Sequence, residues 1–139
     1  RIEIMENKKV AIYCRVASKN RVEIKKQKEI LKNYCNENNY EIYKIYIDNG
    51  YSGIDDNRPN YNKLLNDLKK NIFDTIIVRD MSRLGRSIIK LEKVIKLLEN
   101  NNCNLICLNE DINSKKAVGK LFLKCVSLLP NMIGGENDE

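Results

Sequence analysis

The sequence contains no histidine in its 139 residues, and this absence removes several classes of active site. A Ser-His-Asp triad and a Cys-His nucleophile pair both need an imidazole, as does every histidine-based zinc or iron site. Any chemistry must therefore depend on Arg, Lys, Asp, Glu, Ser, Tyr or Cys. The five cysteines include no Cys-x-x-Cys pair, so we expect reduced, buried thiols and neither a metal site nor a redox pair.

Long apolar runs are also absent. No run approaches the roughly 20 residues that a membrane-spanning helix needs, and the first residues, RIEIMENKK, lack the apolar core of a signal peptide. We therefore expect a cytoplasmic protein with no membrane partner. The length suits one domain, because single domains commonly have about 100 to 150 residues. We expect this domain at 8–130, with flexible termini at 1–7 and 131–139.

Positive charge is in excess. The chain has 25 Lys and Arg residues against 19 Asp and Glu, which gives a formal net charge of +6. Such an excess favours a polyanionic partner such as DNA, although lysine-rich surfaces also serve only to solvate a protein.

Two kinds of apolar segment alternate along the chain. Short runs rich in β-branched residues predict strands at 9–15, 41–48, 74–79 and 104–108. Apolar residues at helical spacing predict helices at 22–38, from Pro59 with Asn57 as its cap, after Ser87, and at 118–129. This alternation predicts an α/β fold with an open, mainly parallel four-stranded sheet and helices on both faces.

Polar residues follow three of the predicted strands. Binding sites in open α/β sheets form beyond the carboxyl ends of the strands, and this rim would carry Arg15, Ser18, Asp48, Arg58, Arg79, Asp80, Ser82, Arg83 and Arg86. Arginine holds phosphate oxygens in pairs, and a serine hydroxyl can be the nucleophile of a phosphoryl transfer. Each arginine alone could be a solvated strand end or the partner of a carboxylate. Their convergence favours an anion site.

Four motifs in order resemble the catalytic domain of the serine recombinases, the resolvase and invertase family that includes large serine integrases and transposon recombinases. They are YCRVAS, YIDNGYSG, NRPNYNKLL and VRDMSRLGRS, and the resemblance covers roughly Lys9 to Leu129. It implies site-specific DNA cleavage and strand exchange through a 5′-phosphoserine link, with no metal, cofactor or small-molecule substrate. It also implies DNA as the partner, a homodimer on each site and a tetramer during strand exchange.

The resemblance also implies roles for single residues. Arg15, Arg58, Arg83 and Arg86 match the arginines that hold the phosphate. Asp48 matches the acidic residue after the second strand, and Gln27 approximates a glutamine of the first helix. The last predicted helix corresponds to the start of the dimerising helix, although it meets Pro130 where the family's helix continues.

The nucleophile position departs from the family's Arg-Val-Ser pattern, because Ala17 follows Arg15-Val16 and Ser18 stands one place later. Three accounts are open: an engineered Ser→Ala change, a natural substitution in a member that binds DNA without cutting it, or a shifted nucleophile at Ser18. Gln27 lies nine residues after Ser18, the spacing expected between the family's nucleophile and that glutamine. Against the shift, neighbouring residues of an extended strand point to opposite sides.

Two other functions can be compared with that of a catalytic recombinase. A non-catalytic DNA-binding or regulatory partner of an active recombinase would have the same fold and the same arginines. A receiver or nucleotide-binding module is disfavoured, because no glycine-rich phosphate loop follows the first strand and arginines occupy the rim where a receiver has acidic residues.

Overall fold

A computed structural model describes residues 8–54 and 57–115 of the chain. In chain order the elements are β1 (Lys9–Val16), α1 (Arg21–Glu37), β2 (Glu41–Asn49), α2 (Pro59–Leu68), β3 (Thr75–Val78), the 3₁₀ helix η1 (Met81–Arg83), α3 (Ile88–Asn100), β4 (Asn104–Cys107) and β5 (Ile112–Asn113). The helix predicted at 118–129 lies outside the described residues. Across the two described ranges, no helix is both long enough and apolar enough to span a bilayer.

The strands form one sheet in the order β2-β1-β3-β4-β5. The first four are parallel, and β5 pairs antiparallel with β4. This confirms the predicted mainly parallel sheet and adds one strand to its edge. The fifth strand was not predicted because its two residues are too few to form an apolar pattern.

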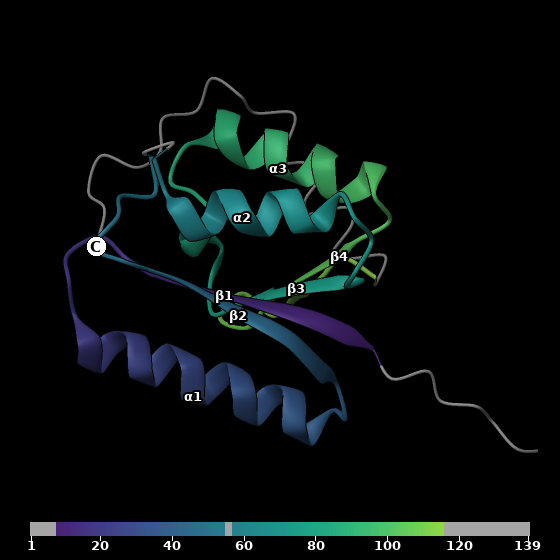
Figure 1. The fold of residues 1–139 in the computed structure, drawn as a ribbon, viewed down its shortest axis with the longest axis horizontal. Coiled ribbons are helices and arrows are strands. Elements are labelled where there is room, and N and C mark those ends of the chain that lie inside the picture. Colours follow the sequence, from purple (N-terminus) through teal and green to yellow (C-terminus); the bar gives the residue numbers. More distant parts are fainter. Residues whose placement is uncertain (1–7, 55–56, 116–139) are drawn as a thin grey trace, which may run out of the picture.

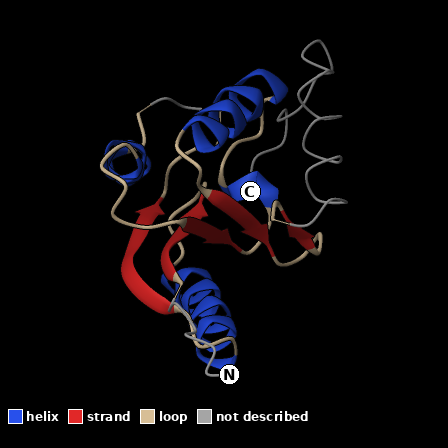
Figure 2. Ribbon diagram, turned by 90° about the vertical axis from the view of Figure 1, so that its right-hand side faces the viewer, coloured by secondary structure: helices blue, strands red, loops and turns tan. Residues whose placement is uncertain are grey.

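Helices cover both faces of the sheet, with α1 on one side and α2 and α3 on the other (Figures 1 and 2). Successive side chains of β1 alternate between these two layers, as expected for a strand. Val10, Ile12, Cys14 and Val16 pack in the α1 layer, whereas Ala11 and Tyr13 pack in the α2 and α3 layer. Arg15 continues the alternation of Ala11 and Tyr13, so its side chain belongs to the α2 side.

Short polar contacts fix where the helices begin. Asn20 caps α1 by accepting a hydrogen bond from the Glu23 amide at 3.0 Å. The expected cap at Asn57 was wrong, because the N-cap residue of α2 is Arg58 and Pro59 opens the helix. Ser87 does precede α3, but among the described residues its side chain forms no capping bond with that helix.

Candidate functional site

Three arginines from distant parts of the sequence meet where β1 and β3 end. The side chains of Arg15, Arg58 and Arg83 come from β1, the start of α2 and η1. Only 0%, 1% and 2% of their respective surfaces are exposed. The structure therefore excludes the reading of Arg15 as a solvated strand end, and it brings together three of the four predicted phosphate-binding arginines.

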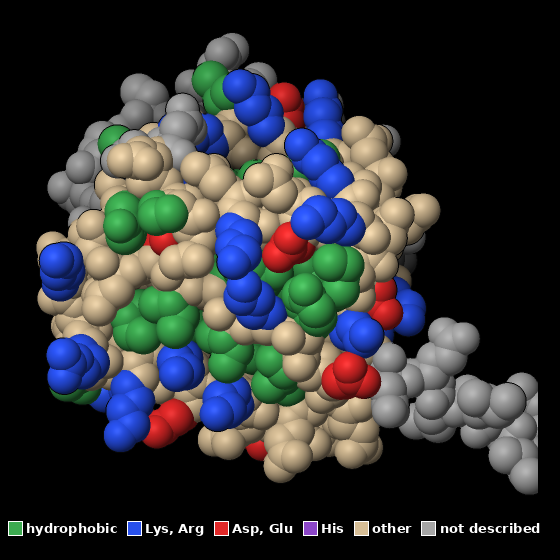
Figure 3. Space-filling model, in the orientation of Figure 1, with side chains coloured by type: hydrophobic (Ala, Val, Ile, Leu, Met, Phe, Trp, Pro, Cys, Tyr) green, Lys and Arg blue, Asp and Glu red, His purple; other side chains and the backbone are tan. Residues whose placement is uncertain are grey.

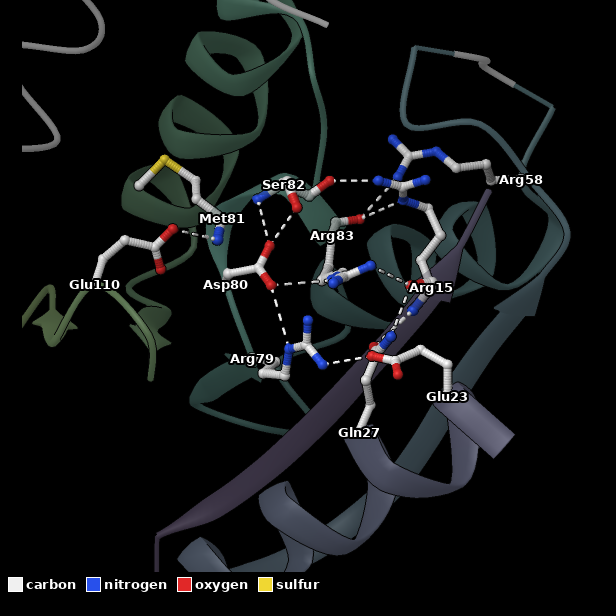
Figure 4. A network of polar contacts seen from close by, with 10 residues as sticks. All are labelled: Arg15, Glu23, Gln27, Arg58, Arg79, Asp80, Met81, Ser82, Arg83 and Glu110. Carbon is white, nitrogen blue, oxygen red and sulfur yellow. Dashed lines mark hydrogen bonds and ion pairs between the residues drawn. The ribbon is translucent and has the colours of Figure 1, made fainter. Parts of the chain in front are cut away.

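Backbone carbonyl groups hold the Arg15 guanidinium (Figure 4). Its Nε donates to the Arg83 carbonyl at 3.2 Å, its Nη1 to the Tyr51 carbonyl at 3.0 Å and its Nη2 to the Ser82 carbonyl at 2.6 Å. Arg83 returns the contact, because its Nη1 donates to the Arg15 carbonyl at 3.0 Å. The two arginines thus bind each other's main chain and lock the end of β1 to η1.

Arg58 joins this pair through a shared acceptor. Its Nη1 donates to the Arg83 carbonyl at 3.2 Å, the same oxygen that Arg15 contacts. Its guanidinium carbon lies 3.6 Å from the centre of the Tyr61 ring, at the distance of a cation-π contact. The guanidinium groups of Arg15 and Arg58 therefore meet at the Arg83 carbonyl, and Arg15 also contacts the carbonyl of the preceding residue, Ser82.

Gln27 ties α1 to the end of β1. Its side chain is fully buried, its Oε1 accepts from the Arg15 amide at 3.2 Å, and its Nε2 donates to the Arg15 carbonyl at 2.9 Å. A side-chain amide has one acceptor and two donors, so it can pair with both backbone groups of a single residue. Gln27 thus fixes the peptide from which the Arg15 side chain extends.

Asp48 fixes the start of α2. This buried carboxylate accepts from the Tyr13 hydroxyl at 2.7 Å, the Asn60 amide at 3.0 Å and the Tyr61 amide at 2.9 Å. Burial raises the pKa of the Tyr13 phenol well above its ordinary value, with Arg58 opposing the shift and Asp48 adding to it. Tyr13 is therefore a neutral donor, and the cap expected from Asn57 is supplied from β2 instead.

Arg86 and Arg79 have different surroundings from the buried three. Arg86 is half-buried, and its amide donates to the Gly53 carbonyl at 3.3 Å. A Cβ added at Gly53 would lie 2.7 Å from Arg15 Nη2 and 3.1 Å from Arg86 Cγ, so this position between the two arginines has no room for a side chain. Arg79 is a carboxylate partner, as its Nη1 lies 2.5 Å from Glu23 Oε1.

The loop that follows β1 is anchored to the end of β2. The amides of Gly50 and Tyr51 both donate to the Val16 carbonyl, at 2.8 and 3.0 Å, and the Asn20 amide donates to Asn49 Oδ1 at 2.9 Å. Within this loop Ala17 is half-buried and Ser18 is exposed. The structure therefore does not bring Ser18 into the buried arginine cluster.

Sequence reasoning named Asp80 on the rim but gave it no function in the site. Its carboxylate accepts from Arg83 Nε at 3.1 Å, and it stands in the VRDMSRLGRS motif beside two arginines, which was the available signal. The carbonyl acceptors of residues 51, 82 and 83 have no such signal, because any residue type has a carbonyl. In the portion of the chain that the structure describes, no group of three or more acidic or cysteine side chains could hold a metal ion.

Comparison with known proteins identifies this architecture. The family model described as Resolvase, N terminal domain, matches residues 10–134. The chain belongs to this family.

Two solved structures of the family resemble this chain. They are the N-terminal catalytic domain of TP901-1 integrase and a resolvase family site-specific recombinase from Streptococcus pneumoniae. The first has a TM-score of 0.83 and 35% identity and covers 89% of this chain and 95% of that one. The second has a TM-score of 0.78 and 28% identity and covers 90% and 87%.

Two curated relatives match parts of this resolvase-like serine recombinase catalytic domain. DNA-invertase hin of Salmonella typhimurium is 32% identical over 81 residues, which are 58% of this chain and 42% of the invertase. An uncharacterized immunity region protein 3 of Bacillus phage phi105 is 38% identical over 69 residues, which are 47% of this chain and 84% of that protein. The chain therefore spans less than half of the invertase that it matches.

Proposed function

We propose that this domain binds a DNA phosphate between Arg15, Arg58, Arg83 and Arg86, and that Ala17 leaves the site without its nucleophile. The reciprocal contact between Arg15 and Arg83, with Arg58 on the same carbonyl, is the observation that carries the proposal. We take this phosphate to belong to DNA, because the proteins that resemble the chain include a DNA-invertase and a site-specific recombinase.

The donor groups of the cluster suit an anionic ligand. Arg15, Arg58 and Arg83 bring three buried guanidinium groups together at the ends of β1 and β3. A guanidinium group is always charged and can hold phosphate oxygens in pairs. Lys and Arg side chains also outnumber Asp and Glu on the face of the molecule seen in Figure 3.

With a serine at position 17, the site would hold the hydroxyl nucleophile that DNA cleavage requires. The hydroxyl oxygen attacks the phosphorus atom, the bond from phosphorus to the 3′-oxygen breaks, and the hydroxyl proton ends on the released 3′-hydroxyl. The arginines stabilise the extra negative charge of the transition state. The products are a 5′-phosphoserine link and a free 3′ end, so neither an oxidant nor a nucleotide is consumed.

Position 17 suits this reaction better than position 18. β1 ends at Val16, so position 17 is the first residue beyond the strand and lies two residues after Arg15. Ala17 is half-buried, whereas Ser18 is exposed. The nine-residue spacing between Ser18 and Gln27 needs no shared chemistry, because Gln27 binds the backbone of Arg15.

Ala17 also favours a second function, that of a subunit that binds DNA without cutting it and assembles with an active recombinase. Dimers on each DNA site and a tetramer during exchange are proposed for either function. The two functions differ in whether a hydroxyl restored at position 17 is enough for cleavage.

The test fuses the chain and its Ala17→Ser variant to a zinc-finger array, which delivers them to a known DNA sequence. The substrate is a nicked duplex with two inverted finger sites at graded spacings, so that a covalent adduct is trapped. We expect no adduct from the unchanged chain and an adduct at position 17 from Ala17→Ser. Adding Arg15→Lys to Ala17→Ser should reduce adduct formation by about 100-fold or more, because lysine cannot reproduce the guanidinium fork.

Two results would contradict the proposal. An adduct mapped to Ser18 in the unchanged chain would establish Ser18 as a shifted nucleophile. It would also overturn the proposal that the site lacks a nucleophile. If DNA is bound but Ala17→Ser forms no adduct at any spacing, the cleavage function fails. If the fusions bind DNA and an adduct forms only on an added active recombinase, the chain is the subunit that binds DNA without cutting it.

A further inference from the structure

The Asp80 carboxylate has an acceptor position for each of four donors. Oδ1 accepts from the Ser82 amide at 3.1 Å and from the Ser82 hydroxyl, and Oδ2 accepts from Arg83 Nε at 3.1 Å and Arg79 Nε at 3.4 Å. An ionised carboxylate has about four lone-pair sites, so these contacts fill it. Asp80 therefore cannot rotate without losing a bond, and it is a fixed reference point at the end of β3 (Figure 4).

Arg83 is held from two directions. Its Nε contacts Asp80 and its Nη1 contacts the Arg15 carbonyl, while only 3% of its side-chain surface is exposed. Because the guanidinium group is planar and rigid, two fixed bonds to different nitrogens set its orientation. Asp80 supplies one of these two bonds, and this bond is also an ion pair.

A second link runs from Asp80 to α1. Arg79 bridges Asp80 on one side and Glu23 on the other, and Glu23 lies in the first turn of α1, directly after the loop of residues 17–20. The carboxylate is thus connected both to the arginine cluster and to the helix that follows the nucleophile position. Asp80 thus contacts arginine side chains, whereas Asp48 contacts the Tyr13 hydroxyl and the start of α2.

We infer that Asp80 is a positioning residue that orients the Arg83 guanidinium, and through it the Arg15 peptide, toward a bound phosphate. Its effect on cleavage rests on the proposed function, whereas its effect on Arg83 does not. Asp80→Asn removes the charge and replaces one acceptor oxygen with an NH₂ donor. That donor must then face either the Ser82 donors or the N–H groups of Arg83 and Arg79, so part of the present set of hydrogen bonds is lost.

The first measurement follows Arg83 directly in the unchanged 139-residue background. In a ¹⁵N-labelled sample, the Nε–H signal of Arg83 is assigned by its loss in Arg83→Lys. We expect this signal in the parent protein to exchange slowly with water, and in Asp80→Asn to exchange at least about 10-fold faster. The control is Glu41→Gln. This change removes an exposed carboxylate at the start of β2, where it pairs with Lys9, and it should leave the Arg83 signal unchanged.

The second measurement uses cleavage by the zinc-finger fusion that carries Ala17→Ser. Adding Asp80→Asn should lower the rate of adduct formation by about 10- to 100-fold, since a small misplacement of a positioning group has effects of this size. The dissociation constant for DNA should change less than about threefold. Ser82→Ala, which removes one donor to Asp80 and leaves Arg83 in place, should have an intermediate effect and guards against a variant that fails to fold.

The outcomes separate the two ideas. If Ala17→Ser alone forms no adduct, the proposed function fails, and the Arg83 signal still decides the role of Asp80. If that signal is the same in Asp80→Asn as in the parent, the positioning role is wrong. If DNA affinity and cleavage fall together by the same factor, Asp80 acts on binding as a whole and the inference is also overturned.

Discussion

At the scale of the residue, backbone carbonyls are the main acceptors for the buried guanidinium groups. A guanidinium has five N–H donors and no acceptor, and its burial is tolerated only when these donors find partners. Arg15 contacts carbonyls of three residues and Arg83 contacts one. A carbonyl carries only a partial charge, so each of these bonds satisfies a donor while the formal charge stays on the guanidinium group. The contacts therefore fix where the guanidinium groups of Arg15 and Arg83 lie.

We predict that the Asp80 carboxyl makes the free energy of unfolding depend on pH in the acid range. Burial alone raises the pKa of this carboxyl, but the hydrogen bond from Ser82 and the charges of Arg83 and Arg79 outweigh it, so the pKa lies below its ordinary value of 3.8. The stabilisation by the charged Asp80 is therefore complete above about pH 5 and is lost as the pH falls through the ordinary value of 3.8 to the lowered native pKa. Urea denaturation of the parent and Asp80→Asn should give a stability difference that is constant from pH 7 to about pH 5 and shrinks in stronger acid.

Glu41→Gln is the control for general effects of acid, because its carboxylate is exposed at the start of β2. A stability difference between the parent and Asp80→Asn that grows as the pH falls would contradict the lowered pKa.

At the scale of the element, β2 controls where α2 begins. The first four amides of a helix have no partner within it, and here two of them, from Asn60 and Tyr61, donate to Asp48 across the layer boundary. The same contact places Arg58, which immediately precedes the helix. The strand β2 therefore sets the position of Arg58, a residue of the proposed phosphate site that lies outside the strand.

Removing the Asp48 carboxylate should loosen this junction. We expect Asp48→Ala to lower the free energy of unfolding by roughly 2–4 kcal/mol, because two helix amides and the Tyr13 hydroxyl lose their acceptor. Tyr13→Phe, which removes only one of the three bonds, should cost about 1 kcal/mol. Chemical denaturation followed by circular dichroism measures both. Equal losses in the two variants would mean that the helix amides find other acceptors.

At the scale of the whole molecule, the sheet separates two apolar layers, and both contain cysteines. Cys14 and Cys35 lie in the layer under α1, and Cys103 and Cys107 lie in the layer under α2 and α3. All four are free and buried, as the sequence predicted for the cysteines; Cys125 lies outside the described residues. Burial raises the pKa of Cys14 to about 12 and that of Cys35 to about 11.

These thiols should report the opening of each layer. Because the thiolate is the reactive form, we expect the four buried cysteines of a Cys125→Ser variant to resist a disulfide reagent at pH 8 in the native state. They should react fully and fast in denaturant. Mass spectrometry after brief labelling identifies which thiols react first. A native thiol that reacts as fast as a free model thiol would show that its layer is open to water.

The sequence was sufficient for those features that leave a pattern in it. Apolar runs located the four parallel strands, and the motifs placed Arg15, Arg58 and Arg83 on one rim. Contacts to carbonyls were not predictable, since Tyr51 and Ser82 take part through atoms that every residue has. The cap of α2 was misassigned to Asn57 because sequence rules consider neighbours along the chain, whereas Asp48 is a neighbour only in space.

The glycine that lies against Arg15 has a consequence for the kinetics of the phosphate binding that we propose. Arg15 is fully buried, with the Tyr51 carbonyl and Gly53 against its guanidinium group. Under the proposed function, a phosphate oxygen would reach that group only in molecules where this backbone has moved aside. The measured dissociation constant is then the intrinsic one divided by the open fraction, so an open population of about 1% weakens the apparent affinity about 100-fold. Association would be limited by the rate of opening, and it would level off as the DNA concentration rises.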